Sequence, residues 1–392
     1  MNKIYYLLFL LIGLNFNIVA GFYYFDILII FYLLYNYKKL TISKTSKLFI
    51  KLIFCLIILP SIISIIYQYI AFDILEQYSI YIPYNSILLM AYLLFLSNTI
   101  TKIDLNYNIS ISLFFIPIMV AIFMFHIPIV NSFFSNIYNI DQYYMFHRAA
   151  GIWGKDVNQL GYYSSIFMIF SSFLIVKKKI NYLFGILLLL ISVYAVLISG
   201  MRTGLAAILF TVLFLSIFYK SPTFKVKYLF LIILISLSLV YLLALNFIPE
   251  EIIKSIIERF DFELFSDQLT GASGDGHIGN MYAKWYNIFV QESTVLKALF
   301  SFDPSWKFPD SLVIFYFANN GLIGVLLLLI FIVFSIKIIN SQKINYMRFL
   351  VLLFSVITAF KGLYPFNNVS MFIFTFISLL EIHEIKILNK CE

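Results

Sequence analysis

The chain has 392 residues, of which 62% are hydrophobic and 12% are charged, and its formal net charge is +8. A soluble domain carries roughly 25% charged residues and cannot bury apolar runs of about 20 residues along most of its length. The lysines stand in small groups between these runs, which indicates membrane orientation and argues against a nucleic-acid-binding surface. The composition therefore predicts an all-α polytopic integral membrane protein.

The apolar runs predict about 12 transmembrane helices. In chain order, we expect these spans at residues 4–20, 22–36, 50–71, 84–100, 109–130, 161–176, 182–199, 204–219, 228–247, 311–336, 346–360 and 367–383. The first run also fits a secretory signal peptide, with Lys3 before an apolar core and Ala20 at a cleavage site. Ile18 is a poor residue for the −3 position, so a retained helix is the preferred interpretation.

Basic residues orient these spans. With a cytoplasmic N-terminus, 18 of the 27 Lys and Arg residues fall in inner segments. Five of the remaining 9 (27 − 18) lie in one long outer segment, to which the positive-inside rule does not apply. The pattern predicts a single membrane domain over 1–392 with both termini cytoplasmic. Its only large insert is an extracytoplasmic loop at 248–310, between the ninth and tenth spans.

Two outer segments, 131–160 and 248–310, differ from the short, lysine-containing inner loops because their polar side chains are more varied. In the longer one, an amphipathic helix is expected to begin at Pro249, and a second one is expected around Trp285. Between them lies a loop with four glycines. A Gly-rich loop before a helix can bind an anion through backbone N–H groups. A plain flexible loop is the favoured interpretation here.

Residues 199–204, with the sequence SGMRTG, join two predicted spans with almost no loop. Arg202 is therefore expected at the outer membrane boundary, where a charged side chain usually has a partner. The alternative is an arginine that extends its charge to the interface. Because the flanking Gly200 and Gly204 allow close backbone approach, we favour a buried functional arginine.

Other polar side chains of the outer face fit more than one role. Arg148 and Asp156 precede the sixth span, where a solvated loop and a site are equally good interpretations. Asp310 precedes the tenth span and, on its pattern alone, fits a helix cap. His147 and His277 have the chemistry of general bases, although a lone histidine near a membrane surface more often hydrogen-bonds locally. Two distant histidines do not make a metal site, so we expect no metal ion and no cofactor.

Taken together, several segments resemble the O-antigen polymerase/ligase superfamily, which includes the capsular polysaccharide polymerases of the Wzy type. The resemblance is carried, in order, by 147–151 (HRAAG), 156–161 (DVNQLG), 197–205 (LISGMRTGL), 309–312 (PDSL) and 320–324 (NGLIG). Each motif alone is weak. The ordered set covers roughly 148–324 and has the family's arrangement of spans and outer loop.

Two departures from the family pattern bear on the function. The large loop of the family usually carries an arginine shortly before its tryptophan, whereas this chain has Lys284 before Trp285. Lysine supplies a point charge without the bidentate geometry of arginine. Ligases of the superfamily typically have a histidine where this chain has Asp310, which favours a polymerase.

The resemblance implies metal-independent glycosyl transfer from an undecaprenyl-diphosphate-linked oligosaccharide, at the outer face of the bacterial plasma (inner) membrane. Arg148 and Arg202, with Lys284, would bind the diphosphate as its negative charge develops. Asp310 is the first candidate for the base that activates the acceptor hydroxyl, and His277 is the second. The candidate sugar-binding residues are Trp153, Asp156, Asn158 and Trp285.

The implied partners are the lipid-linked oligosaccharide, membrane lipids, a chain-length regulator and a flippase, with no nucleic acid. Two alternatives remain open at this point. A ligase would transfer the glycan to another acceptor. A flippase or transporter would also have about 12 spans, but it should show internal repeats and ionisable residues deep in several spans. We see no clear repeat, and apart from Asp26 and Arg202 the spans are nearly free of charge. The sequence does not distinguish a capsule from the O-antigen of lipopolysaccharide.

Overall fold

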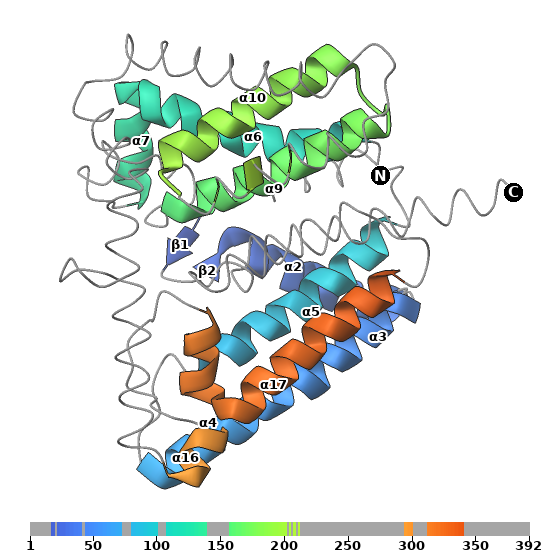
Figure 1. Ribbon diagram of the computed structural model, residues 1–392, viewed down its shortest axis with the longest axis vertical. Helices are drawn as coiled ribbons and strands as arrows, with labels where there is room; N and C mark the ends of the chain where they lie inside the picture. The colour runs from blue at the N-terminus through green and yellow to red at the C-terminus, as the bar shows by residue number, and fades with distance from the viewer. Residues whose placement is uncertain are drawn as a thin grey trace, which may run out of the picture. The chain divides into compact units, whose positions relative to one another are not determined.

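A computed structural model describes part of the chain, and this part is helical apart from two short strands (Figure 1). The described residues are 17–19, 22–40, 44–72, 80–100, 107–138, 157–201, 204, 207–208, 211, 294–300 and 312–340. The chain divides into two compact units. Unit 1 comprises residues 1–25 and 105–265, and unit 2 comprises residues 26–104 and 266–392.

Three helices in the described part are long and apolar enough to cross a membrane, namely Ile50–Ile70, Gln159–Val176 and Tyr182–Ser199. They agree with the predicted spans 50–71, 161–176 and 182–199. These helices are consistent with an α-helical membrane protein. The total of about 12 spans, the single membrane domain and the 248–310 loop stay predictions, since the structure describes only residues 294–300 of that loop.

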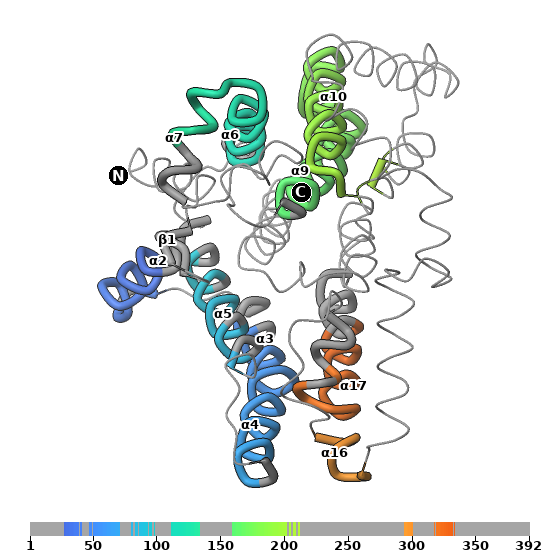
Figure 2. The backbone as a smooth tube through the Cα atoms, turned by 90° about the vertical axis from the view of Figure 1, so that its left-hand side faces the viewer, coloured from blue at the N-terminus to red at the C-terminus, as the bar shows by residue number. Residues whose placement is uncertain are grey.

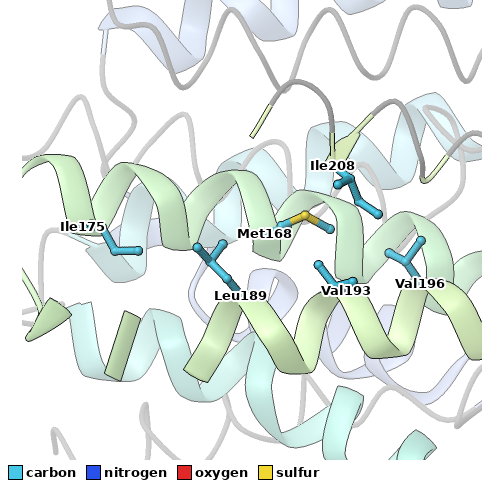
Figure 3. Packing of buried hydrophobic residues seen from close by; sticks show 6 residues of the cluster. All are labelled: Met168, Ile175, Leu189, Val193, Val196 and Ile208. Carbon is cyan, nitrogen blue, oxygen red and sulfur yellow. The ribbon is translucent and has the colours of Figure 1, made fainter. Parts of the chain in front are cut away.

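Unit 1 is built on an antiparallel pair, α9 (Val157–Val176) and α10 (Tyr182–Ser199). Every residue of α9 from 159 to 175 is buried, so this helix is the centre of the unit. Figure 3 shows the apolar side chains that pack between the two helices and the segment that follows them. They are Met168, Ile175, Leu189, Val193, Val196 and Ile208.

Unit 1 also contains α6 (Tyr107–His126) and α7 (Pro128–Tyr138). The sequence predicts one span over 109–130, but α6 ends at His126, so the predicted end is wrong. The cause is local. The α conformation is disfavoured for a residue that precedes proline. Ile127 precedes Pro128 and is not helical. Pro128 then occupies the first position of α7, where its missing N–H is not needed.

Unit 2 is built around one continuous helical run from 44 to 72, seen in Figure 2 as a single long tube. It comprises α3 (Lys44–Ile53), the π-helical turn η2 (Phe54–Ile58) and α4 (Leu59–Phe72). The other helices are α2 (Tyr24–Tyr35), which belongs to this unit from residue 26 onward, η1 (Tyr37–Lys39), α5 (Tyr81–Ile100), α16 (Val295–Phe300) and α17 (Leu312–Asn340). Contacts join α17 to α3, η2, α4 and α16.

The first two predicted spans differ from the structure at their junction. Residues Asn17–Val19 form β1 and Phe22–Tyr23 form β2, and the two strands pair antiparallel where helices were expected. The β-branched Ile18 and Val19 favour a strand. The helix α2 has 12 residues and is about 18 Å long, which is shorter than the roughly 30 Å hydrocarbon core.

The tenth predicted span, 311–336, corresponds to α17 but is not one uninterrupted helix. Gly321 has φ 62° and ψ −168°, which is not helical, and Figure 1 shows the two parts of α17 running in different directions. The predicted span thus corresponds to a helix that is interrupted at Gly321.

Candidate functional site

The end of α10 forms a compact turn that begins the SGMRTG segment. Gly200 adopts the left-handed conformation (φ 63°) and donates its N–H to the carbonyl oxygen of Leu197 at 3.0 Å, which ends the helix. The Ser199 hydroxyl donates to Val196 O at 2.7 Å and accepts from the Met201 N–H at 3.3 Å. Ser199 and Met201 are buried. The turn is thus held by its own hydrogen bonds inside the protein.

Gly161 of α9 brings the second family-like motif against this turn. A Cβ built on Gly161 would lie 2.5 Å from both Met201 Cβ and Ser199 Oγ. Real Cβ atoms essentially never approach this closely, so glycine is required for the two segments to meet. The motif at 156–161 and the motif at 197–205, read separately in the sequence, are in direct contact in unit 1.

Gly204 serves the same purpose on the other side of the turn. A Cβ on Gly204 would lie 2.4 Å from Val196 Cγ1 and 3.5 Å from the Ser165 hydroxyl oxygen. Gly204 and the described helical residues after it, at positions 207, 208 and 211, are buried and share one helix face. The two glycines that the sequence marked for close approach therefore have different roles: Gly200 allows the turn and Gly204 allows the packing.

A polar contact links α6 to α10 near the same end of unit 1. His126 Nε2 and the Tyr194 hydroxyl are hydrogen-bonded, and their rings stack with centroids 5.8 Å apart and an interplanar angle of 11°. Elsewhere, Phe114 of α6 contacts Phe167 of α9 at 5.2 Å between ring centroids. The helix α6 therefore contacts α9 near Phe114, and the last residue of α6, His126, contacts α10.

Unit 2 contains a second polar cluster, at the break in α17. The Ser64 hydroxyl of α4 donates to Phe300 O at 2.8 Å and also contacts the carbonyl oxygen of Asn319. The Gln68 side chain donates to the same Asn319 oxygen at 2.9 Å. Ser64, Gln68, Asn319 and Asn320 are all buried. A broken helix leaves backbone groups without intrahelical partners, and in an apolar environment other protein groups must satisfy them.

Most sequence-predicted site residues lie outside the described residues. These are Arg148, Trp153, Asp156, Arg202, His277, Lys284, Trp285 and Asp310. Asn158 lies in the first turn of α9, although its side chain is not among those described. The structure thus places the start of α9, which carries Asn158, against the turn that precedes Arg202. The assignments of these residues to diphosphate, sugar and proton transfer stay predictions.

Sequence reasoning missed the cross-helix contacts His126–Tyr194 and Ser64–Gln68–Asn319. One signal was present for the second of these. Ser64 and Gln68 are polar, lie inside an apolar span and are four residues apart, so they share one helix face. Polar residues in such spans usually face the protein interior. The sequence held no comparable signal for the partner, which is a backbone carbonyl exposed by a helix break.

Comparison of the chain with family models, with curated proteins and with solved structures finds no match. The functional assignment therefore depends on the chain's own motifs and on the contacts between them.

Proposed function

We propose that this protein polymerises undecaprenyl-diphosphate-linked oligosaccharide repeat units by glycosyl transfer at the outer face of the bacterial plasma membrane. The observation that carries the proposal is the contact of Gly161 with Ser199 and Met201. It joins two of the segments that resemble the polymerase/ligase superfamily. Arg202 directly follows Met201 in the chain, and Asn158 lies one turn before Gly161 on α9. The residues proposed to bind phosphate and sugar, Arg202 and Asn158, therefore stand next to the two segments that meet.

The proposed reaction needs no metal ion or other cofactor. The hydroxyl oxygen of the acceptor sugar attacks the anomeric carbon of the donor, and the bond from that carbon to the diphosphate oxygen breaks. The acceptor proton passes to the Asp310 carboxylate, with His277 as the second candidate base. The diphosphate leaves with increased negative charge, which Arg148, Arg202 and Lys284 stabilise. A direct displacement of this kind inverts the anomeric carbon.

The proposal is tested with purified protein in nanodiscs and a synthetic repeat unit on undecaprenyl diphosphate. Wild type is expected to produce a ladder of polymer lengths. The Arg202→Ala and Asp310→Ala variants should each lose on the order of 10²–10³ in rate. Lys177→Ala is the matched control, because it removes an exposed cation from the opposite end of α9. Equal rates for Arg202→Ala and Lys177→Ala would remove Arg202 from the site.

A flippase is the second candidate, because the break in α17 favours it. Discontinuous membrane helices often form the substrate sites of transporters. The same nanodisc preparation, moved into sealed vesicles, distinguishes the two functions. Movement of the lipid-linked sugar across the bilayer without any ladder would overturn the polymerase proposal. A single transfer to a different acceptor, with no ladder, would instead identify a ligase.

A further inference from the structure

We propose that Ser64 and Gln68 of α4 are positioning residues of the transferase, because they clamp the C-terminal end of α16 and the break in α17 to one point. The inference rests on the proposed function. The chain between α16 and α17, residues 301–311, carries Asp310, the proposed base. Neither Ser64 nor Gln68 is assigned any contact with substrate.

The clamp is a set of contacts from one face of α4. Ser64 reaches two segments at once, through the carbonyl oxygens of Phe300 and Asn319. Gln68, one turn further along, donates to the same Asn319 oxygen at 2.9 Å. The ring of Tyr67, between them in the chain, lies 5.8 Å from the ring of Phe300, measured between centroids. The end of α16 is therefore held by a hydrogen bond from the Ser64 side chain to a backbone carbonyl oxygen and by a ring contact.

The use of the Ser64 hydroxyl differs from that of its neighbour on the same helix. The Ser61 hydroxyl donates to Ile57 O at 2.8 Å, within its own helical run, as serines in membrane helices commonly do. The Ser64 hydroxyl instead contacts carbonyl oxygens from two other helices. Both serines are buried, at 1% and 2% exposure. The difference between them is therefore the partner of the hydroxyl and not its depth in the protein.

Gly321 shows the same junction from the side of α17. A Cβ on Gly321 would lie 2.3 Å from Leu299 O and 2.6 Å from Phe300 N. The backbone of α16 thus lies directly against the backbone of the break, with no room for a side chain. Contacts from α4 and steric fit with α17 independently join the end of α16 to the same place.

The clamp has a direct consequence for residues 301–311. The segment follows Phe300, which accepts a hydrogen bond from Ser64, and precedes Leu312, which begins the helical stretch of α17 that contains Asn319, the second contact of Ser64. Because residues 312–320 are helical, the contact with Asn319 also restrains Leu312, so both ends of the segment are restrained. A reacting group must be held close to its productive geometry, and an error of about 1 Å in placement can reduce the rate on the order of 10²-fold. A restrained pair of ends limits this error for Asp310.

The activity test compares Ser64→Ala and Gln68→Met with Ser61→Ala, in the nanodisc polymerisation assay. Ser64→Ala and Gln68→Met are expected to lower kcat roughly 10- to 100-fold with KM for the lipid-linked substrate unchanged. Ser61→Ala should keep the wild-type kcat. Ser64→Thr, which retains the hydroxyl, should restore most of the activity. A kcat that is the same for Ser64→Ala and Ser61→Ala would overturn the positioning role.

A distance measurement tests the clamp independently of activity. Spin labels are placed on Leu48→Cys and Val295→Cys, both exposed positions, in a Cys55→Ala, Cys391→Ala background. Leu48 lies about 24 Å from Ser64 along the helical run, and Val295 lies in α16, whose end contacts Ser64. The separation between the two labels therefore suits pulsed dipolar spectroscopy. The distance distribution should be narrow in the unmodified background and with Ser61→Ala, and should broaden with Ser64→Ala. An unchanged distribution with Ser64→Ala would overturn the clamp even if the protein forms polymer. If the background protein forms no polymer, the proposed function fails, and the distance distribution still decides whether the clamp exists.

Discussion

Gly161 of α9 lies directly against Met201, the residue that follows the left-handed turn at Gly200. A Cβ on Gly161 would stand 2.5 Å from the Met201 Cβ and 2.8 Å from its sulfur. Because a Cβ atom cannot move without its backbone, this contact ties the start of α9 to the end of α10. The contact joins two family-like motifs, and it is the most specific support for a shared site.

Gly161→Ala is expected to destabilise unit 1 by about 1–3 kcal/mol, the usual effect of overpacking. Gly185→Ala is the matched comparison in the same helix pair. Its added Cβ would meet the Ile175 side chain, at 2.4 Å from Cγ1 and 2.8 Å from Cδ1. A side chain can rotate away, so the loss should be smaller. Unfolding in detergent, followed by circular dichroism, measures both variants, and an equal loss would contradict this reading of the Gly161 contact.

The hydrogen bond between His126 and Tyr194 should couple α6 to α10. Tyr194→Phe and His126→Phe each retain a ring but remove the hydrogen bond. A double-mutant cycle should give a coupling energy of about 0.6 kcal/mol, with about 1.7 kcal/mol as the upper end for hydrogen bonds between membrane helices. Leu183→Ala, at an exposed position at the other end of α10, should show no coupling with His126→Phe. A coupling of zero for the first pair would show that the contact contributes nothing to stability.

Gly321→Ala should be among the most destabilising alanine substitutions in unit 2. The positive φ with an extended ψ alone costs an alanine about 1–3 kcal/mol, and the added methyl group would meet the α16 backbone at 2.3 Å. We therefore expect a total loss above about 2 kcal/mol in the free energy of unfolding. Leu322→Ala, at an exposed neighbouring position, is the control and should have little effect. Thermal unfolding of the purified variants measures the difference, and similar melting temperatures would show that the junction rearranges freely.

The predicted orientation is tested by cysteine labelling in intact cells, in a background without Cys55 and Cys391. Thr294→Cys lies at an exposed position of the predicted outer loop and should react with a membrane-impermeant maleimide. Lys177→Cys lies at an exposed position of a predicted inner segment and should react only after the membrane is opened. The reverse pattern would invert the whole topology and move the proposed site to the cytoplasmic face.

The best sequence prediction is the span 182–199, whose bounds coincide with those of α10. Both ends carry local signals. Asn181 caps the first turn by accepting the Leu183 N–H at 3.1 Å, and Gly200 provides the left-handed residue that ends the helix. Pro128 is a comparable signal for the end of α6. The prediction of 109–130 followed the apolar residues, which continue past this proline. Apolar length predicts that a segment is helical in a membrane, but its ends depend on capping residues.

The break at Gly321 was not predictable from its surroundings in the sequence. A glycine inside an apolar helix is usually tolerated, and Gly185 and Gly161 are helical in this chain. Gly321 differs because α16 presses on it and because α4 supplies donors for the carbonyl oxygen of Asn319. These partners come from segments far apart in the chain. The break is therefore a property of the packed unit.

The apolar and helical character of this chain, and its suitability for a membrane, follow from composition and from periodic patterns within about 20 residues. The glycines at which segments meet are also visible in the sequence. The pairing of segments follows from the folded protein: the turn at Gly200 lies against the start of α9, and Ser64 contacts both Phe300 and Asn319. The reason is physical. A buried hydroxyl or a glycine in a close contact needs a partner from a distant part of the chain. Which backbone comes within hydrogen-bonding or van der Waals distance depends on the packing of the whole unit, and the neighbouring residues in the sequence do not encode it.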